Sequence, residues 1–95
     1  ILAVRELGGK KVMRITGGLG KALRNDFMHA LTRVGVDEID LEGVTVVDQA
    51  GLALCLVACN RHGVTLGAQS PCFADAWKQA LAVPGEIEKM EQPGL

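Results

Sequence analysis

Aromatic rings and nucleophilic hydroxyl groups are scarce in this chain. Aromatic residues make up 3% of its 95 residues, there is no tyrosine, and Ser70 is the only serine. The formal net charge is −1. Proteins that bind nucleic acids use a basic surface for the phosphate backbone and aromatic rings on which single-stranded bases stack. The composition therefore argues against nucleic acid as a partner.

Residues that could perform catalysis are equally few, and the sequence does not bring them together. Ser70 precedes a proline where a helix cap is expected, while His29 and His62 fall in two different predicted helices. Asp40 and Asp48 could be a carboxylate pair, but Asp48 lies immediately before a predicted helix and is more simply its N-cap. We therefore expect a protein that is not an enzyme and that carries no cofactor.

Long apolar runs and signal-like segments are also missing. The longest apolar run, Ala50 to Cys59, is about half as long as a bilayer-spanning helix requires. The chain has three cysteines, an odd number, and no charged segment followed by an apolar stretch and a cleavage site. These features favour a cytoplasmic protein in a reducing environment, without direct insertion into a membrane.

The size and the hydrophobic content fit one small domain. A chain of 95 residues with 48% hydrophobic residues can form one core, which here must consist mainly of Leu, Val, Ile and Ala. No repeat, linker or low-complexity tract interrupts it. We expect a single domain over residues 1–95, with the mixed, polar tail 86–95 frayed.

The first half of the chain predicts a β-hairpin followed by a helix. Residues Leu2–Leu7 and Lys11–Thr16 alternate between apolar and polar and are separated by two glycines and a lysine. The glycine-rich segment Gly17–Gly20 is expected to break the second strand. From Lys21, apolar residues recur at helical spacing until Gly35, which predicts one amphipathic helix that ends there.

The second half predicts two more strands and two more helices. Their expected positions are a strand region at 36–47 with a bulge or bend at Gly43, a helix at 49–61 that ends at His62-Gly63, a strand at 64–67, and a helix that Ser70-Pro71 begins and Pro84-Gly85 ends. The element order β-β-α-β-α-β-α predicts an α/β fold with a mixed β-sheet and helices packed against it.

The most informative segment is the junction between the third strand region and the second helix. Val44, Val46 and Val47 are β-branched residues that suit a strand, whereas the apolar residues from Leu52 onward suit a helix. Asp48 is placed to cap that helix. A glycine in its first turn lets another part of the backbone pass closely or leaves an open surface for a partner.

This segment resembles the signature of the STAS family, the small domains of anti-sigma-factor antagonists and of the cytosolic tails of sulfate transporters. Family members read roughly apolar-Asp-Leu-x-x-Val-x-x-apolar-Asp-x-Ser-Gly-Leu. The matching residues here are Asp40, Leu41, Val44, Asp48, Gly51 and Leu52. The resemblance implies a STAS-like mixed sheet with helices mainly on one face, and a module that binds other proteins.

The chain departs from the STAS pattern at one functional position. In the phosphorylated antagonists a serine precedes the signature glycine, but here that residue is Ala50. A methyl group cannot be phosphorylated, so the charge switch of the family is absent at this position. The resemblance implies a partner-binding face that includes the residues Asp48, Gln49, Ala50, Gly51 and Leu52, and we expect docking there to be constitutive or regulated elsewhere.

Two biological settings follow from the resemblance, and the sequence leaves both open. The first is a regulatory, signal-transducing role as an anti-sigma-factor antagonist, whose partner is an anti-sigma factor or kinase-like protein. The second is the small STAS subunit of a bacterial lipid-asymmetry ABC transporter, whose partner is the ATPase subunit. The absence of a phosphorylatable serine weakens the signalling role. The sequence around Gly51-Leu52-Ala53-Leu54 fits the transporter subunit. The oligomeric state is not predicted.

Two further patterns suggest other kinds of site. Gly17-Gly18-Leu19-Gly20-Lys21 resembles a phosphate loop but lacks the upstream glycine and the downstream Ser or Thr, so Gly17 and Gly18 remain only candidates for weak anion or nucleotide contact. Cys55, Cys59 and His62 share one predicted helix face, as the ligands of a zinc or redox site would, with Cys72 as the remaining ligand. Buried core cysteines explain that spacing more simply, and no metal is expected.

Overall fold

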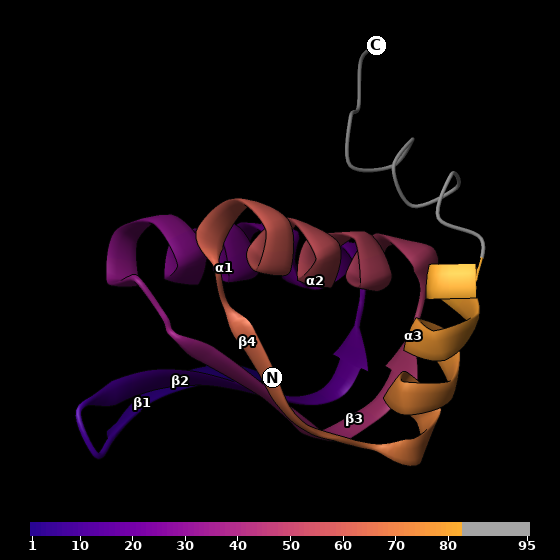
Figure 1. Cartoon of the computed structure of the whole chain (residues 1–95), viewed down its shortest axis with the longest axis horizontal. Helices are drawn as coiled ribbons and strands as arrows, with labels where there is room; N and C mark the ends of the chain where they lie inside the picture. The colour runs from indigo at the N-terminus through magenta and orange to yellow at the C-terminus, as the bar shows by residue number, and fades with distance from the viewer. Residues whose placement is uncertain (83–95) are drawn as a thin grey trace, which may run out of the picture.

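The computed structural model describes residues 1–82 of the chain (Figure 1). Strands and helices alternate along it after an N-terminal pair of strands. The elements are β1 (Leu2–Leu7), β2 (Lys10–Leu19), a 3₁₀ turn (Lys21–Leu23), α1 (Arg24–His29), a π-helical turn (Ala30–Val34), β3 (Glu38–Val47), α2 (Gln49–His62), β4 (Thr65–Gln69) and α3 (Pro71–Ala82). The protein therefore has an α/β fold, as the sequence predicts.

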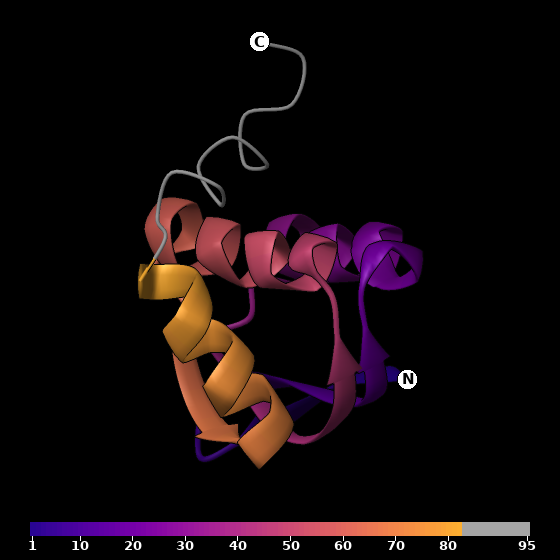
Figure 2. The ribbon, with the colours of Figure 1, turned by 90° about the vertical axis from the view of Figure 1, so that its right-hand side faces the viewer.

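The four strands form one mixed sheet in the order β1-β2-β3-β4. β1 and β2 are antiparallel, whereas β2, β3 and β4 are parallel to one another. The two crossovers through α1 and α2 advance across the sheet in the same direction, and right-handed crossovers of that kind place their helices on the same face. Figures 1 and 2 show α1 and α2 side by side over one face, with α3 leaning against the sheet near the end of β3.

The N-terminal hairpin is longer than the sequence predicts. β2 does not stop before the glycine-rich segment but continues through Gly17 and Gly18 to Leu19. Gly17 adopts a φ of 81°, and the register between β2 and β3 shifts immediately after it. The glycines therefore form an irregular part of the ladder, because pairing with β3 outweighs their weak strand propensity. The predicted break at Gly17 is wrong.

The first predicted helix is present but is not uniformly α-helical. It begins as a 3₁₀ turn, continues as α1 and ends as a π-helical turn. Gly35, with a φ of 77°, ends it and donates its N–H to the Ala30 carbonyl at 2.9 Å. Thr32 Oγ1 also donates to the carbonyl of Met28 at 2.8 Å, a bond that loosens the regular helical ladder. The predicted stop at Gly35 is confirmed.

The remaining boundaries agree closely with the sequence. The β2–β3 register shifts on the approach to Gly43, as the predicted bulge requires. α2 ends at Gly63, which has a φ of 64°. Ser70 Oγ accepts a hydrogen bond from the Phe73 N–H at 3.2 Å, which confirms the cap of α3. The predicted end of α3 at Pro84-Gly85 and the predicted frayed tail lie outside the described residues.

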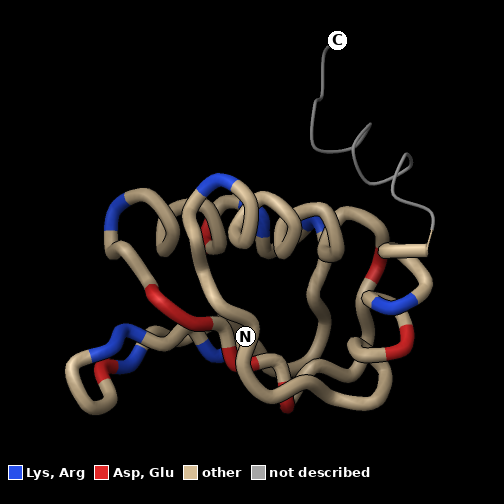
Figure 3. The backbone as a smooth tube through the Cα atoms, viewed as in Figure 1, with Lys and Arg blue, Asp and Glu red and all other residues tan. Residues whose placement is uncertain are grey.

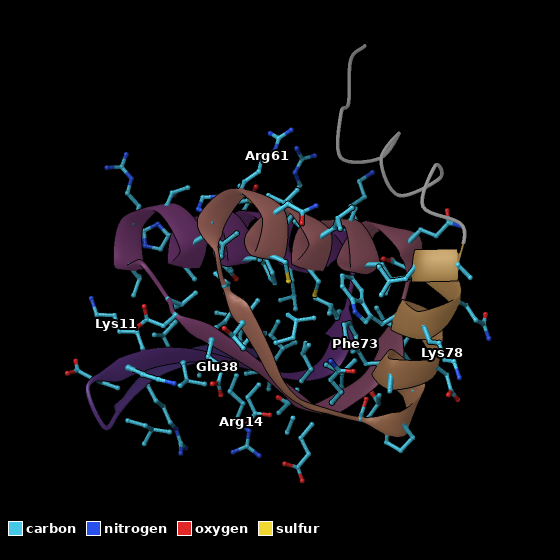
Figure 4. The ribbon with its side chains drawn as sticks, viewed as in Figure 1. Lys11, Arg14, Glu38, Arg61, Phe73 and Lys78 are labelled. Atoms are coloured by element: carbon cyan, nitrogen blue, oxygen red, sulfur yellow. The ribbon has the colours of Figure 1, made fainter. Side chains whose placement is uncertain are left out.

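The core lies between the sheet and the three helices. Phe73 points from α3 into this space, whereas Lys78 on the same helix points outward (Figure 4). The opposite face of the sheet carries charged side chains, and Arg14 extends from it away from α1 and α2 (Figure 4). The largest fully buried side chains are those of Phe27, Phe73, Met13, Ile15, Leu19, Ile39, Leu41, Val44 and Cys55. Aliphatic residues dominate this set, as the composition predicts.

Candidate functional site: the corner between β3 and α2

The corner is built around the carboxylate of Asp48, which caps α2. Asp48 has an extended backbone, and its Oδ1 accepts a hydrogen bond from the Gly51 N–H at 2.8 Å. Its own N–H donates to the carbonyl of Leu19 at the end of β2, at 3.3 Å. The predicted N-cap is confirmed. Because Asp48 bonds both to α2 and to β2, it fixes the start of the helix against the ends of two strands.

Two glycines allow the chain segments to meet at this corner. A methyl group on Gly51 would lie 2.8 Å from the Leu19 carbonyl carbon and still nearer its oxygen. A methyl group on Gly20 would lie 2.5 Å from Asp48 Oδ2. Real Cβ atoms essentially never approach other atoms so closely. Of the two roles expected for Gly51, close passage of the backbone is therefore the observed one, and an open surface at that residue is wrong.

The five residues predicted to bind a partner are not equally accessible. Asp48 and Gln49 are exposed and Ala50 is half-buried, whereas Gly51 and Leu52 are buried, with Leu52 only 7% exposed. A partner can therefore touch Asp48, Gln49 and Ala50 directly. Gly51 and Leu52 shape the corner from beneath it. Val46, two residues before Asp48 on β3, is 64% exposed and adds apolar surface beside the corner.

Three residues that contribute to the corner were not singled out as part of it from the sequence. Leu19 supplies the carbonyl that Asp48 bonds, Gly20 makes room for the Asp48 carboxylate, and Val46 is an exposed apolar neighbour. The glycine pattern at 17–20 was a visible signal of unusual backbone. Its connection to Asp48 depends on the parallel pairing of β2 with β3, which no local pattern reveals.

The other residues that match the STAS signature have structural roles. Leu41 and Val44 are buried in the core, with exposed fractions of 0% and 2%. Asp40 Oδ1 accepts a hydrogen bond from the Glu42 N–H at 3.0 Å, so its carboxylate stabilises the local backbone of β3. Within residues 1–82, no hydrogen bond links the Asp40 carboxylate to the Asp48 carboxylate, as a catalytic pair would require.

The proposed anion contact at Gly17 and Gly18 has no support in the geometry. Both residues lie within β2 and pair with Val44 and Val46 of β3. They do not form the loop before a helix that would present free N–H groups to an anion. The turn that leads to the following helix is formed by Gly20 instead, and it contains no side-chain cap. The prediction of an anion site assumed that these two glycines form a loop before a helix, and that assumption is wrong.

The three cysteines differ in burial, and of them Cys55 alone belongs to the core. Cys55 is fully buried, Cys59 is partly buried and Cys72 is exposed, and all three are free thiols. Within residues 1–82, no group of three or more His, Cys, Asp or Glu side chains is arranged to hold a metal ion. His62 is exposed at the end of α2. The burial of Cys55 and the partial burial of Cys59 agree with the core interpretation of their spacing.

The burial of Cys55 predicts a loss of stability in alkaline solution. Burial, and secondarily the nearby thiol of Cys59, raises the pKa of Cys55 from 9.0 to about 12. The unfolded chain therefore releases this proton at a lower pH than the folded chain. The stabilising contribution is complete below pH 9 and is lost as the pH rises from 9 towards 12.

We expect the free energy of unfolding in urea to fall between about pH 9 and about pH 10.5, and to fall less steeply in Cys55→Ala. Cys72→Ala is the matched control, because Cys72 is exposed, and it should keep the pH dependence of the unaltered chain. Parallel pH profiles for Cys55→Ala and Cys72→Ala would contradict the assignment.

Comparisons with protein-family models, curated proteins and solved structures find no match to this chain. Among residues 1–82, no helix combines the length and the apolar character that crossing a membrane requires. The apolar run from Ala50 to Cys59 belongs to α2, where most of its residues are buried against the sheet.

Proposed function

We propose that this chain is a STAS-like module that binds another protein through the corner between β3 and α2. The observation that carries the proposal is the geometry of that corner. Asp48 and Gly51 hold the start of α2 against the end of β2, and Ala50 is left partly accessible beside them. The mixed four-stranded sheet with helices packed on it is compatible with the fold that the resemblance implies.

The corner offers shape rather than reactive chemistry. Its one carboxylate, Asp48, accepts a backbone N–H and lies against Gly20, so it is engaged within the fold. Ala50 has no ionisable or nucleophilic group, and its small side chain allows a partner to approach the first turn of α2. Val46 adds an exposed apolar contact nearby. A small, partly apolar corner on a rigid junction suits protein docking, and it offers no nucleophile and base for an enzyme.

Ala50 makes docking constitutive in this proposal. A phosphoserine here would place about two negative charges at the start of α2, and a helix start tolerates such charge. Inhibition in switchable relatives would therefore arise at the partner surface, through repulsion or obstruction. Ala50 cannot acquire that charge, so docking at the corner is permanent or is controlled elsewhere.

Two partners remain in the proposal. An anti-sigma factor or kinase-like protein would make the chain a regulator of transcription, and the ATPase of a lipid-transport ABC transporter would make it a transporter subunit. The absence of a modifiable hydroxyl at Ala50 favours the transporter setting, because a partner-switching circuit needs the switch. A metal-binding or redox role has no support from the placement of Cys55, Cys59 and His62.

Affinity capture from the source cell tests the proposal. The tagged chain is expected to retain one protein that Ala50→Glu does not retain, and mass spectrometry then identifies it. An ATPase accompanied by a permease indicates transport, whereas a kinase-like protein indicates signalling. Retention of the same proteins by the unaltered chain and by Ala50→Glu would contradict docking at the corner.

A further inference from the structure

The exposed edge of the sheet at β1 is a second feature that suggests association. Among residues 1–82, β1 pairs with β2 alone, and all of its residues except Leu2 are exposed. In Figure 1 the β1–β2 hairpin projects away from the helices. An uncovered edge strand presents unpaired N–H and C=O groups that can pair with another strand. β1 also lacks proline and a bulge, two features that commonly protect such an edge.

The outward-facing groups of β1 can be identified from its bonds to β2. Ile1 and Thr16 exchange two hydrogen bonds, of 2.7 and 2.9 Å. In an antiparallel ladder, hydrogen-bonded pairs alternate with pairs that do not exchange bonds. Ala3, Arg5 and Leu7 therefore direct their backbone groups towards β2. The N–H and C=O groups of Leu2, Val4 and Glu6 point outward, where a further strand would bind.

The exposed apolar side chains along this edge are spaced symmetrically about Val4. Three of the five exposed large apolar residues among residues 1–82 are Ile1, Val4 and Leu7, with exposed fractions of 84%, 36% and 57%. Ile1 and Leu7 are each three residues from Val4. A two-fold axis at Val4 would place Val4 opposite its own copy and Ile1 opposite Leu7 of the second chain. All three exposed side chains would then gain an apolar neighbour.

We propose that β1 pairs antiparallel with β1 of a second copy of this chain, with Val4 on the two-fold axis, to form one continuous eight-stranded sheet. The competing registers are less favourable. An axis at Arg5 or Glu6 would set two like charges directly opposite each other, and an axis at Ala3 would set the apolar Ile1 opposite the charged Arg5. The hairpin carries charges of both signs (Figure 3), but Arg5, Lys10 and Lys11 outnumber Glu6, so the backbone hydrogen bonds and apolar contacts of the pairing have to outweigh a net positive charge.

Sedimentation equilibrium on the purified chain tests the pairing. A six-residue strand is a small interface, so we expect a dissociation constant on the order of 100 µM. Val4→Lys places two ammonium groups at the axis and should weaken the dimer at least about tenfold. Val46→Lys is the matched control, since Val46 is an exposed valine at another site, and it should dimerise like the unaltered chain.

A crosslink tests the register. Opposite residues in a hydrogen-bonded antiparallel pair have Cα atoms about 5.5 Å apart, within the range of a disulfide. In a Cys72→Ser background, Val4→Cys should oxidise to a covalent dimer much faster than Val46→Cys. A monomer at concentrations up to about 1 mM, or equal behaviour of the Val4 and Val46 variants in either experiment, would overturn the proposal.

Discussion

Gly51→Ala is expected to lower the free energy of unfolding by at least about 2 kcal/mol. The added methyl group would collide with the carbonyl of Leu19, which is backbone at the end of β2 and cannot rotate away. α2 would have to move off the sheet, and the bond from Gly51 to Asp48 would lengthen or break. For a domain of this size, whose total stability is about 5–14 kcal/mol, that is a large fraction.

The sign of the change in the free energy of unfolding distinguishes the collision with Leu19 from the effect of helix propensity. Alanine is favoured over glycine inside a helix by about 1 kcal/mol, so propensity alone predicts that Gly51→Ala stabilises the protein. Gly18→Ala is the control, because a methyl group there meets nothing within 4 Å and the backbone has no positive φ. Urea denaturation of both variants is the measurement. A stability of Gly51→Ala equal to or above that of the unaltered chain would show that α2 does not depend on the close contact.

Ala50→Glu has the largest effect that we expect on binding. The substitution adds a charge to the accessible part of the corner while leaving the fold stable, because a carboxylate in the first turn of a helix interacts favourably with the helix dipole. We expect its free energy of unfolding to stay within about 0.5 kcal/mol of the unaltered chain. At a docked surface the same carboxylate would be desolvated without a partner.

The affinity for the captured partner should therefore fall by at least about 100-fold, or about 2.7 kcal/mol. Ala68→Glu is the matched control, since Ala68 is an exposed alanine on β4 and lies outside the corner. Isothermal titration of the purified partner with both variants gives the comparison. An affinity of Ala50→Glu within about threefold of that of Ala68→Glu would contradict the proposed docking face.

Features that depend on a few neighbouring residues were predictable from the sequence. Gly35 and Gly63 adopt positive φ angles at the ends of their helices, as predicted for glycines that follow an apolar helical pattern. Ser70 and Asp48 cap helices because their side chains reach N–H groups three residues ahead. These interactions are local, so the sequence pattern contains all the residues that make them.

Features that depend on pairing between distant segments were not predictable in the same way. The segment around Gly17 has the composition of a turn, but it stays in β2 because β3 supplies hydrogen bonds along it. The burial of Leu52 follows from the side of α2 that packs on the sheet, and the unbroken apolar pattern of that helix does not specify a side. The contact of Gly51 with Leu19 joins residues more than thirty positions apart.

The location of the docking face can be measured directly on the isotope-labelled chain. Amide chemical shifts are recorded while the purified partner is added, in the same buffer for every point. We expect the largest changes at Asp48, Gln49 and Ala50, and smaller ones on the uncovered face of the sheet around Arg14 and Asp40. Changes concentrated on that opposite face, with the amides of the corner unaffected, would contradict the account.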